Sequence, residues 1–257
     1  MNRIQELFSS DSKPLLSVYF TAGFPHLDDT RILLRHLQQS GVSLVEIGMP
    51  FSDPLADGPV IQRSSQVALR NGMTLELLFE QLQDMRKEIR MPVLLMGYLN
   101  PVLQFGMERF VRMAAETGVD GVILPDLPLD VYEAEYAEMF RAASLDLIFL
   151  VTPETEPERL QKIDEWSTAF IYAVSSSSTT GKNTNMDAQQ DYFKRLGSGH
   201  LGHPVMVGFG IRDRQTFVTA TRYARGAIIG TAFIQAIENS PDLGRSVHEF
   251  ISSILQP

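Results

Sequence analysis

The chain has 257 residues, of which 44% are hydrophobic and 21% are charged, and its formal net charge at pH 7 is −9. Its scattered Lys and Arg residues argue against a nucleic-acid-binding protein, and the lack of cysteine excludes disulfides, thiolate nucleophiles and cysteine metal sites. Residues 1–20 hold too short an apolar stretch for a signal peptide, and no run of 18 apolar residues follows, so we expect a cytoplasmic protein.

Short apolar runs that predict β-strands alternate along the chain with stretches of helical spacing. The spacing predicts helices between most of the strands, among them 30–41, 75–89, 107–118 and 131–143, and an extra N-terminal helix over 2–8 that covers the bottom of the fold. Eight alternations predict an α/β fold, a (β/α)8 barrel built as a single catalytic domain over 1–257. The predicted strands are 15–20, 42–47, 92–98, 119–124, 145–151, 169–174, 204–209 and 226–230.

An open, doubly wound sheet is the alternative arrangement of the same elements. Such a sheet normally carries a glycine-rich fingerprint after its first strand, but the sequence there, FTAGFPHLDD, is not G-x-G-x-x-G. No linker rich in Pro, Gly and Ser divides the chain into halves. The barrel and the single domain are therefore favoured.

The predicted strand 42–47 carries an acidic residue near its end. Strand alternation puts Leu44 and Glu46 on one face, so Glu46 points into the barrel if Leu44 does. A carboxyl group in that apolar interior has a raised pKa and can keep its proton near neutral pH, as general acid–base catalysis requires. In the alternative register Glu46 faces outward and only pairs with a nearby Arg or Lys.

Two more carboxylates follow in the segment 50–59, PFSDPLADGP, which three prolines stiffen. Asp53 and Asp57 lie close to Glu46 in the chain, and such a cluster of like charges is costly unless a ligand or partner shares it. The alternative is that one of the two aspartates only caps a turn of its own loop.

Glycines end the last two predicted strands, in VGFGI at 207–211 and IIGTA at 228–232. The backbone N–H groups of Gly210, Gly230 and Thr231, beside a helix N-terminus, can bind a phosphate dianion without a lysine. Either glycine alone is often just a tight turn, and the pair in these two strands makes the phosphate site the better hypothesis.

The lysines and histidines are poorly placed for other barrel chemistries. His200 and His203 precede the seventh predicted strand, at the opposite face, which removes the ligands of a metal-dependent aldolase. A Schiff-base aldolase needs a strand-borne lysine, and all the lysines fall outside the predicted strands: Lys13, Lys87, Lys162, Lys182 and Lys194. Proton transfer by carboxylates on a phosphorylated substrate remains, with no metal and no cofactor.

Large apolar and aromatic side chains also occur at the strand ends. Most residues of this kind are ordinary barrel core, but several converging near Glu46 would indicate a flat, apolar substrate body. The candidates are Tyr19 or Phe20, Tyr98, Ile123, Tyr172 and Phe209.

In their order and spacing, these motifs resemble the tryptophan synthase alpha chain family along essentially the whole chain. The element PFSDPLADGP is highly specific, and its joint occurrence with the two late glycine motifs by chance is negligible. The matching segments are FTAGFP, VEIGMPFSDPLADGPVIQ, LLMGYLNP, GVILPDLP, FLVTPET, IYAVSSSSTTG, VGFGI and GAIIGTA.

The resemblance implies a lyase of tryptophan biosynthesis that cleaves indole-3-glycerol phosphate to indole and glyceraldehyde 3-phosphate by retro-aldol chemistry. It implies that Glu46 is the general acid–base residue. It also implies that Asp57 accepts a hydrogen bond from the indole N–H and stabilises the positive charge that develops there.

Further contacts are implied only by this resemblance. Substrate contacts are implied for Phe20, Ile61, Tyr98, Ile123, Tyr172, Thr180 and Phe209. Phosphate contacts are implied for Gly181, Gly210, Gly230 and Thr231.

A partner subunit is implied as well. The family works with a pyridoxal-phosphate-dependent beta chain in an α2β2 heterotetramer, and Pro50, Asp53 and Asn100 fall where the family contacts that chain. Pyridoxal phosphate is expected in the beta chain alone. Two other functions stay open: a phosphate-binding barrel isomerase, and a catalytically silent subunit that only activates a beta chain. Retention of both Glu46 and Asp57 argues against the silent subunit.

Overall fold

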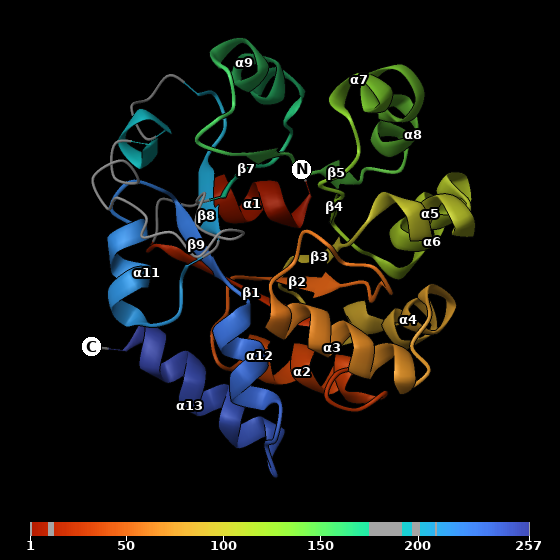
Figure 1. Cartoon of the computed structure of the whole chain (residues 1–257), viewed down its shortest axis with the longest axis vertical. Coiled ribbons are helices and arrows are strands. Elements are labelled where there is room, and N and C mark those ends of the chain that lie inside the picture. Colours follow the sequence, from red (N-terminus) through yellow and green to blue (C-terminus); the bar gives the residue numbers. More distant parts are fainter. Residues whose placement is uncertain (1, 10–12, 175–191, 197–200, 209, 257) are drawn as a thin grey trace.

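The computed structural model describes residues 2–9, 13–174, 192–196, 201–208 and 210–256. Figure 1 shows the strands gathered at the centre, the N-terminal helix lying across the middle and the other helices around them. The element order alternates between strand and helix along most of the chain, as the apolar periodicity predicts.

The strands of the described chain form one parallel sheet. Their order in space is β5-β4-β3-β2-β1-β9-β8-β7-β6, so the strands that are first and last in the sheet are neighbours in the chain. The strands are β1 (Leu15–Thr21), β2 (Leu44–Gly48), β3 (Val93–Met96), β4 (Gly121–Ile123), β5 (Asp146–Leu147), β6 (Leu150–Val151), β7 (Ile171–Val174), β8 (Val205–Gly208) and β9 (Gly226–Ile229).

The predicted fifth strand, 145–151, is two short strands, and the sheet closes through it. β5 pairs with β4 and β6 pairs with β7. Between them the Ile148 N–H donates to the Val122 carbonyl at 2.9 Å, and the Phe149 carbonyl accepts from the Tyr172 N–H at 2.9 Å. One segment therefore bonds to both ends of the sheet, which makes the predicted barrel a closed one.

Two of the predicted helices are interrupted. The helix predicted over 75–89 ends at Leu82, because Asp84 adopts a left-handed φ of 61° before a 3-10 turn begins. The helix predicted over 131–143 has a π-helical middle. The helical elements are α1 (Arg3–Ser9), α2 (Asp29–Gln39), α3 (Pro59–Arg70), α4 (Leu75–Leu82), η1 (Met85–Lys87), α5 (Leu99–Phe105), α6 (Met107–Thr117), α7 (Leu129–Val131), η2 (Tyr132–Tyr136), α8 (Ala137–Ala142), α9 (Pro157–Trp166), α11 (Arg214–Ala220), α12 (Thr231–Ile237) and α13 (Leu243–Leu255).

Strand alternation divides the buried apolar side chains into two cores. The larger one fills the layer between the strands and the surrounding helices, and the smaller one fills the barrel interior. Ile4 of α1 is fully buried in the interior core, and the ring of Phe8 lies 5.3 Å from that of Phe170. The N-terminal helix therefore covers the bottom of the barrel, as the sequence predicts.

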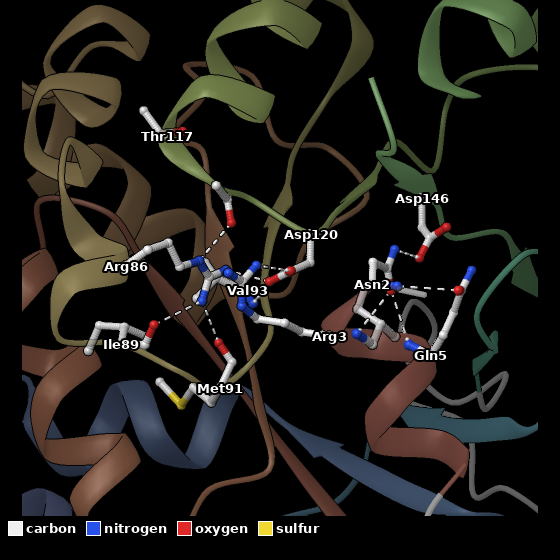
Figure 2. A network of polar contacts seen from close by, with 12 residues as sticks. Asn2, Arg3, Gln5, Arg86, Ile89, Met91, Val93, Thr117, Asp120 and Asp146 are labelled. Carbon is white, nitrogen blue, oxygen red and sulfur yellow. Dashed lines mark hydrogen bonds and ion pairs between the residues drawn. The ribbon is translucent and has the colours of Figure 1, made fainter. Parts of the chain in front are cut away.

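A polar network fixes α1 and the loops at the bottom of the barrel (Figure 2). The buried Asp120 carboxylate accepts hydrogen bonds from Arg3, from Arg86 and from the Val93 N–H. Arg86 also donates to the carbonyls of Gly118, Ile89 and Met91. Because charged groups buried here are paired and hydrogen-bonded, their desolvation is compensated.

Removing the carboxylate of this network should destabilise the fold. In Asp120→Ala the Arg86 guanidinium, 17% exposed, keeps its carbonyl partners but loses its counter-charge. We expect the free energy of unfolding, measured by urea denaturation, to fall by about 3–5 kcal/mol. The control Glu249→Ala breaks an exposed ion pair with Arg245 on α13 and should cost less than about 1 kcal/mol. Equal losses in the two variants would contradict a structural role for the Asp120 network.

Candidate active site

A cleft of about 370 Å³ opens at the carboxyl ends of the strands. Tyr19, Asp57, Ile61 and Met96 line it on the side of β1, β2 and β3. The carboxyl ends of barrel strands are where the catalytic groups of this architecture lie. The cleft is therefore the candidate active site.

Glu46 lies below the cleft in the barrel interior, as the alternation with Leu44 predicts. Its side chain is fully buried, and it does not reach the surface of the cleft that the described residues form. The Ser17 hydroxyl of the neighbouring strand donates to Oε1 at 2.8 Å, while Oε2 has no hydrogen-bond partner among the described residues. Burial raises the pKa of Glu46 to about 8, and the bond from Ser17 opposes that rise. The carboxyl group therefore keeps its proton at neutral pH.

Asp57 reaches the cleft from the stiff loop that follows β2. The loop is held by its own backbone: the Leu55 N–H donates to the Asp53 carbonyl at 2.9 Å and the Asp57 N–H to the Pro54 carbonyl at 3.1 Å. Partial burial raises the pKa of the Asp57 carboxyl, and a hydrogen bond from the Tyr98 hydroxyl offsets part of that rise.

Tyr98 stands behind Asp57. Its hydroxyl donates to Oδ2 of Asp57 at 3.0 Å and accepts from the Ala56 N–H at 3.1 Å. Its ring packs against Phe51, with 5.1 Å between the ring centroids. Tyr98 thus fixes the carboxylate and the loop, and it is not among the described residues that line the cleft.

Two tyrosines cover the barrel interior from above. Tyr19 leans from β1 over Gly48, where an added Cβ would lie 2.1 Å from its hydroxyl oxygen. Tyr172 leans from β7 over Gly208 in the same way, 2.2 Å from an added Cβ. Only glycine leaves room for either ring. Both line the cleft, and burial raises the pKa of both phenols, so their hydroxyls stay neutral.

The predicted phosphate donors line the same cleft, after β8 and β9. Gly210, with a φ of 76°, Gly230 and Thr231 at the start of α12 are all part of its lining. Arg212 also lines the cleft, so the described lining carries both its positive charge and the negative charge of Asp57. Gly181 lies outside the described residues.

The other predicted site residues divide by position. Ile61 lines the cleft, whereas Ile123 is fully buried in the interior core. Phe20 is fully buried in the layer between strands and helices, because β1 turns Tyr19 inward and Phe20 outward. The sequence alone did not decide between these two residues, and the family resemblance favoured Phe20. The structure places Tyr19, and not Phe20, in the lining of the cleft. Thr180 and Phe209 lie outside the described residues.

The predicted partner-contact residues lie at the rim, above the cleft. Asp53 and Asn100 are exposed, Pro50 is partly buried, and the Asp53 carboxylate accepts from the Ser52 hydroxyl at 2.5 Å. Among the described residues, no side-chain hydrogen bond or ion pair joins these three to one another or to the carboxylates of the cleft.

Sequence reasoning missed three residues that the structure brings to this site: Ser17, Met96 and Arg212. Alternation on the first strand, counted inward from Tyr19, would have found Ser17 beneath it. The same count on the third strand would have found Met96. Arg212 follows the glycine motif directly, and no periodicity marks it.

Comparisons with known proteins agree on one family. The family model for the tryptophan synthase alpha chain matches residues 6–253. The chain is similar to the tryptophan synthase alpha chain of Flavobacterium psychrophilum, with 50% identity over 99% of this chain and 100% of the relative. It is also similar to that of Parabacteroides distasonis, with 47% identity over 100% of both chains.

Solved structures give the same result. The tryptophan synthase subunit alpha of Legionella pneumophila superimposes with a TM-score of 0.90 at 33% identity, covering 99% of this chain and 97% of that one. A chain of tryptophan synthase from M. tuberculosis, in its aminoacrylate-bound form, superimposes with a TM-score of 0.85 at 30% identity, covering 99% of this chain and 100% of that one.

The raised pKa of Glu46 should make stability depend on pH. Between its ordinary value of 4.5 and about 8, the unfolded chain loses this proton and the folded chain keeps it. The contribution of Glu46 to the free energy of unfolding therefore falls as pH rises through that window. Glu46→Gln cannot ionise, so its stability relative to the unsubstituted protein should rise by about 1.4 kcal/mol per pH unit there. Urea denaturation across the window measures this, and parallel stability curves would show that Glu46 titrates normally.

Proposed function

The chain belongs to the tryptophan synthase alpha chain family, and from that premise we propose that Glu46 and Asp57 carry out the family's reaction in the cleft. The reaction is the cleavage of indole-3-glycerol phosphate to indole and glyceraldehyde 3-phosphate, a lyase step of tryptophan biosynthesis. The observation that carries the assignment is the pair itself: a buried, protonated carboxyl group beside a carboxylate held by a tyrosine.

The substrate has two unlike ends, and the cleft has two unlike ends to receive them. We assign the indole ring to the side of Asp57, where Ile61 and Met96 supply apolar walls. We assign the phosphate to Gly210, Gly230 and Thr231, whose backbone N–H groups can donate to its oxygens. The glycerol carbons and indole C3 then lie between Tyr19 and Tyr172, within reach of Glu46 below them.

Glu46 begins the reaction as an acid. Its carboxyl gives a proton to indole C3, and the ring nitrogen takes up the positive charge. Asp57, accepting a hydrogen bond from the indole N–H, stabilises that cation. Tyr98 supports this role, because its hydrogen bond to Oδ2 favours the ionised form of Asp57.

Glu46 then acts as a base. Its carboxylate takes the proton of the glycerol hydroxyl next to the scissile bond, a carbonyl forms at that carbon, and the carbon–carbon bond breaks. The bonding electrons return to the indole ring and neutralise its charge. A pKa of about 8 suits both steps, because the group is protonated at the start and becomes a competent base once it has given its proton.

This sequence of steps uses proton transfer and hydrogen bonds alone. We therefore propose that the chain takes no cofactor and no metal, and that pyridoxal phosphate belongs to the beta chain. The lysines that the structure describes support this, because Lys13, Lys87, Lys162 and Lys194 all lie outside the strands. None of the four can present an amine at the end of a barrel strand.

A tryptophan synthase alpha chain is one subunit of an enzyme that also has a beta chain. We propose the α2β2 heterotetramer as the assembly and the cytoplasm as its location. The rim with Pro50, Asp53 and Asn100 is the proposed contact surface, supported by Leu55, which is 87% exposed on the same loop. In the part of the chain that the structure describes, no helix is long and apolar enough to cross a membrane.

The direct test is indole release from indole-3-glycerol phosphate by the purified chain, with and without a beta chain. Glu46→Gln should lower turnover at least about 100-fold, because the amide has the same shape but cannot transfer a proton. The matched control Glu76→Gln changes an exposed side chain paired with Arg109 and should leave turnover unchanged. A loss of less than about tenfold in Glu46→Gln would remove Glu46 from the acid–base role.

The contact surface has its own test. Asp53→Ala should abolish most of the increase in indole release that a saturating beta chain produces, because Asp53 is the exposed carboxylate of the loop that carries Asp57. The control Ser52→Ala removes only the local hydrogen-bond donor of Asp53 and should keep the activation. Full activation of Asp53→Ala by the beta chain would contradict this role and leave Asp53 with only a local role in its own turn.

A further inference from the structure

Ser17 contacts the reacting carboxyl group of Glu46 inside the barrel. Both side chains are fully buried, and the Ser17 hydroxyl donates to Oε1 of Glu46 at 2.8 Å. The two residues sit on neighbouring parallel strands, where Glu46 is the register partner of Tyr19, two residues beyond Ser17. Ser17 therefore reaches Glu46 from below, on the side away from the cleft.

The two oxygens of Glu46 are unlike because of this contact. Oε1 already accepts a hydrogen bond from the Ser17 hydroxyl, so the carboxyl proton is less stable on Oε1 than on Oε2. Oε2 is buried and has no partner among the described residues. A proton on Oε2 is therefore a buried donor with no acceptor among the described residues, and a substrate atom that accepts it satisfies that donor.

We propose that Ser17 is a positioning residue that keeps the transferable proton of Glu46 on Oε2 and holds that oxygen ready for the substrate. The proposal rests on the acid–base role proposed for Glu46. Ser17 touches no substrate in this arrangement, and it acts by fixing the carboxyl group through Oε1. After the proton has left, the same hydroxyl stabilises the carboxylate that must act as the base.

Other groups near Glu46 do not replace this contact. Among the described residues, the ionisable groups that interact electrostatically with Glu46 are Tyr19 of β1 and Tyr172 of β7, and the partner of Glu46 on β3 is the apolar Leu94. Both tyrosines stay neutral because burial raises the pKa of each phenol. Ser17 is therefore the hydrogen-bond donor that distinguishes the two oxygens in the described structure.

The test is Ser17→Ala, which removes the hydroxyl and keeps the small side chain. The bond from Ser17 lowers the pKa of Glu46, so its loss raises that pKa. The reaction needs protonated Glu46 in the free enzyme, so the alkaline fall of kcat/KM should move to higher pH. Turnover at the plateau should drop about tenfold, with KM within about twofold, because the carboxyl group is less well oriented and its anion less stabilised.

Ser64→Ala is the matched control. Ser64 is an equally buried serine on α3 whose hydroxyl bonds to Thr21 and to the Ile61 carbonyl, and not to Glu46. This variant should leave the alkaline limb of the profile where it is. In a Glu46→Gln background, Ser17→Ala should change turnover no further, because its effect passes through the carboxyl group.

A measurement without substrate tests the role of Ser17 separately from the acid–base role proposed for Glu46. Carbon-13 NMR of the labelled glutamate carboxyl groups follows the titration of Glu46, with Glu46→Gln identifying its signal. A titration of Glu46 that Ser17→Ala leaves unmoved overturns the proposal, whatever happens to activity. Full turnover by Glu46→Gln would instead overturn the acid–base role of Glu46. A tenfold loss from Ser17→Ala that persists in the Glu46→Gln background would also overturn the proposal.

Discussion

The site depends on one constraint, which is that an acidic side chain is enclosed by the apolar interior of a barrel. A carboxylate in such a medium is strongly disfavoured, so Glu46 keeps its proton at a pH well above the ordinary pKa of a glutamate side chain. The interior core of apolar side chains below it and the tyrosines above it maintain that enclosure. Proton-transfer chemistry follows from burial here, and the glycines under the two tyrosine rings make the burial possible.

The two carboxylates of the site differ because their surroundings differ. Glu46 belongs to a rigid strand and accepts from one donor within the described ranges, Ser17, while Asp57 belongs to a loop and accepts from a tyrosine hydroxyl at the edge of the cleft. One is thereby suited to give a proton and the other to face a positive charge. Both come from a single strand and the loop after it, so a short stretch of sequence sets the spacing between them.

Much of this could be read from the sequence, and the reasons are local. Strand alternation predicted the inward direction of Glu46, and the regular exchange of strand and helix predicted the barrel. Alternation did not decide between Tyr19 and Phe20, because both are aromatic and the strand is buried on both faces. The break at Asp84 depends on a backbone conformation that most residues avoid, and helical spacing does not report it. Arg212 reaches the cleft from a loop, and loops have no regular sequence pattern that predicts where a side chain points.

The split strand has a further consequence for how the barrel moves. β1 is paired along both of its sides, whereas β5 and β6 are two residues long and each is paired with one neighbour. Few hydrogen bonds therefore join the two ends of the sheet, and transient opening of the barrel costs least free energy where β5 meets β6. This junction lies away from β1 and β2 in the order of strands. Such opening leaves the strands that enclose the acid paired.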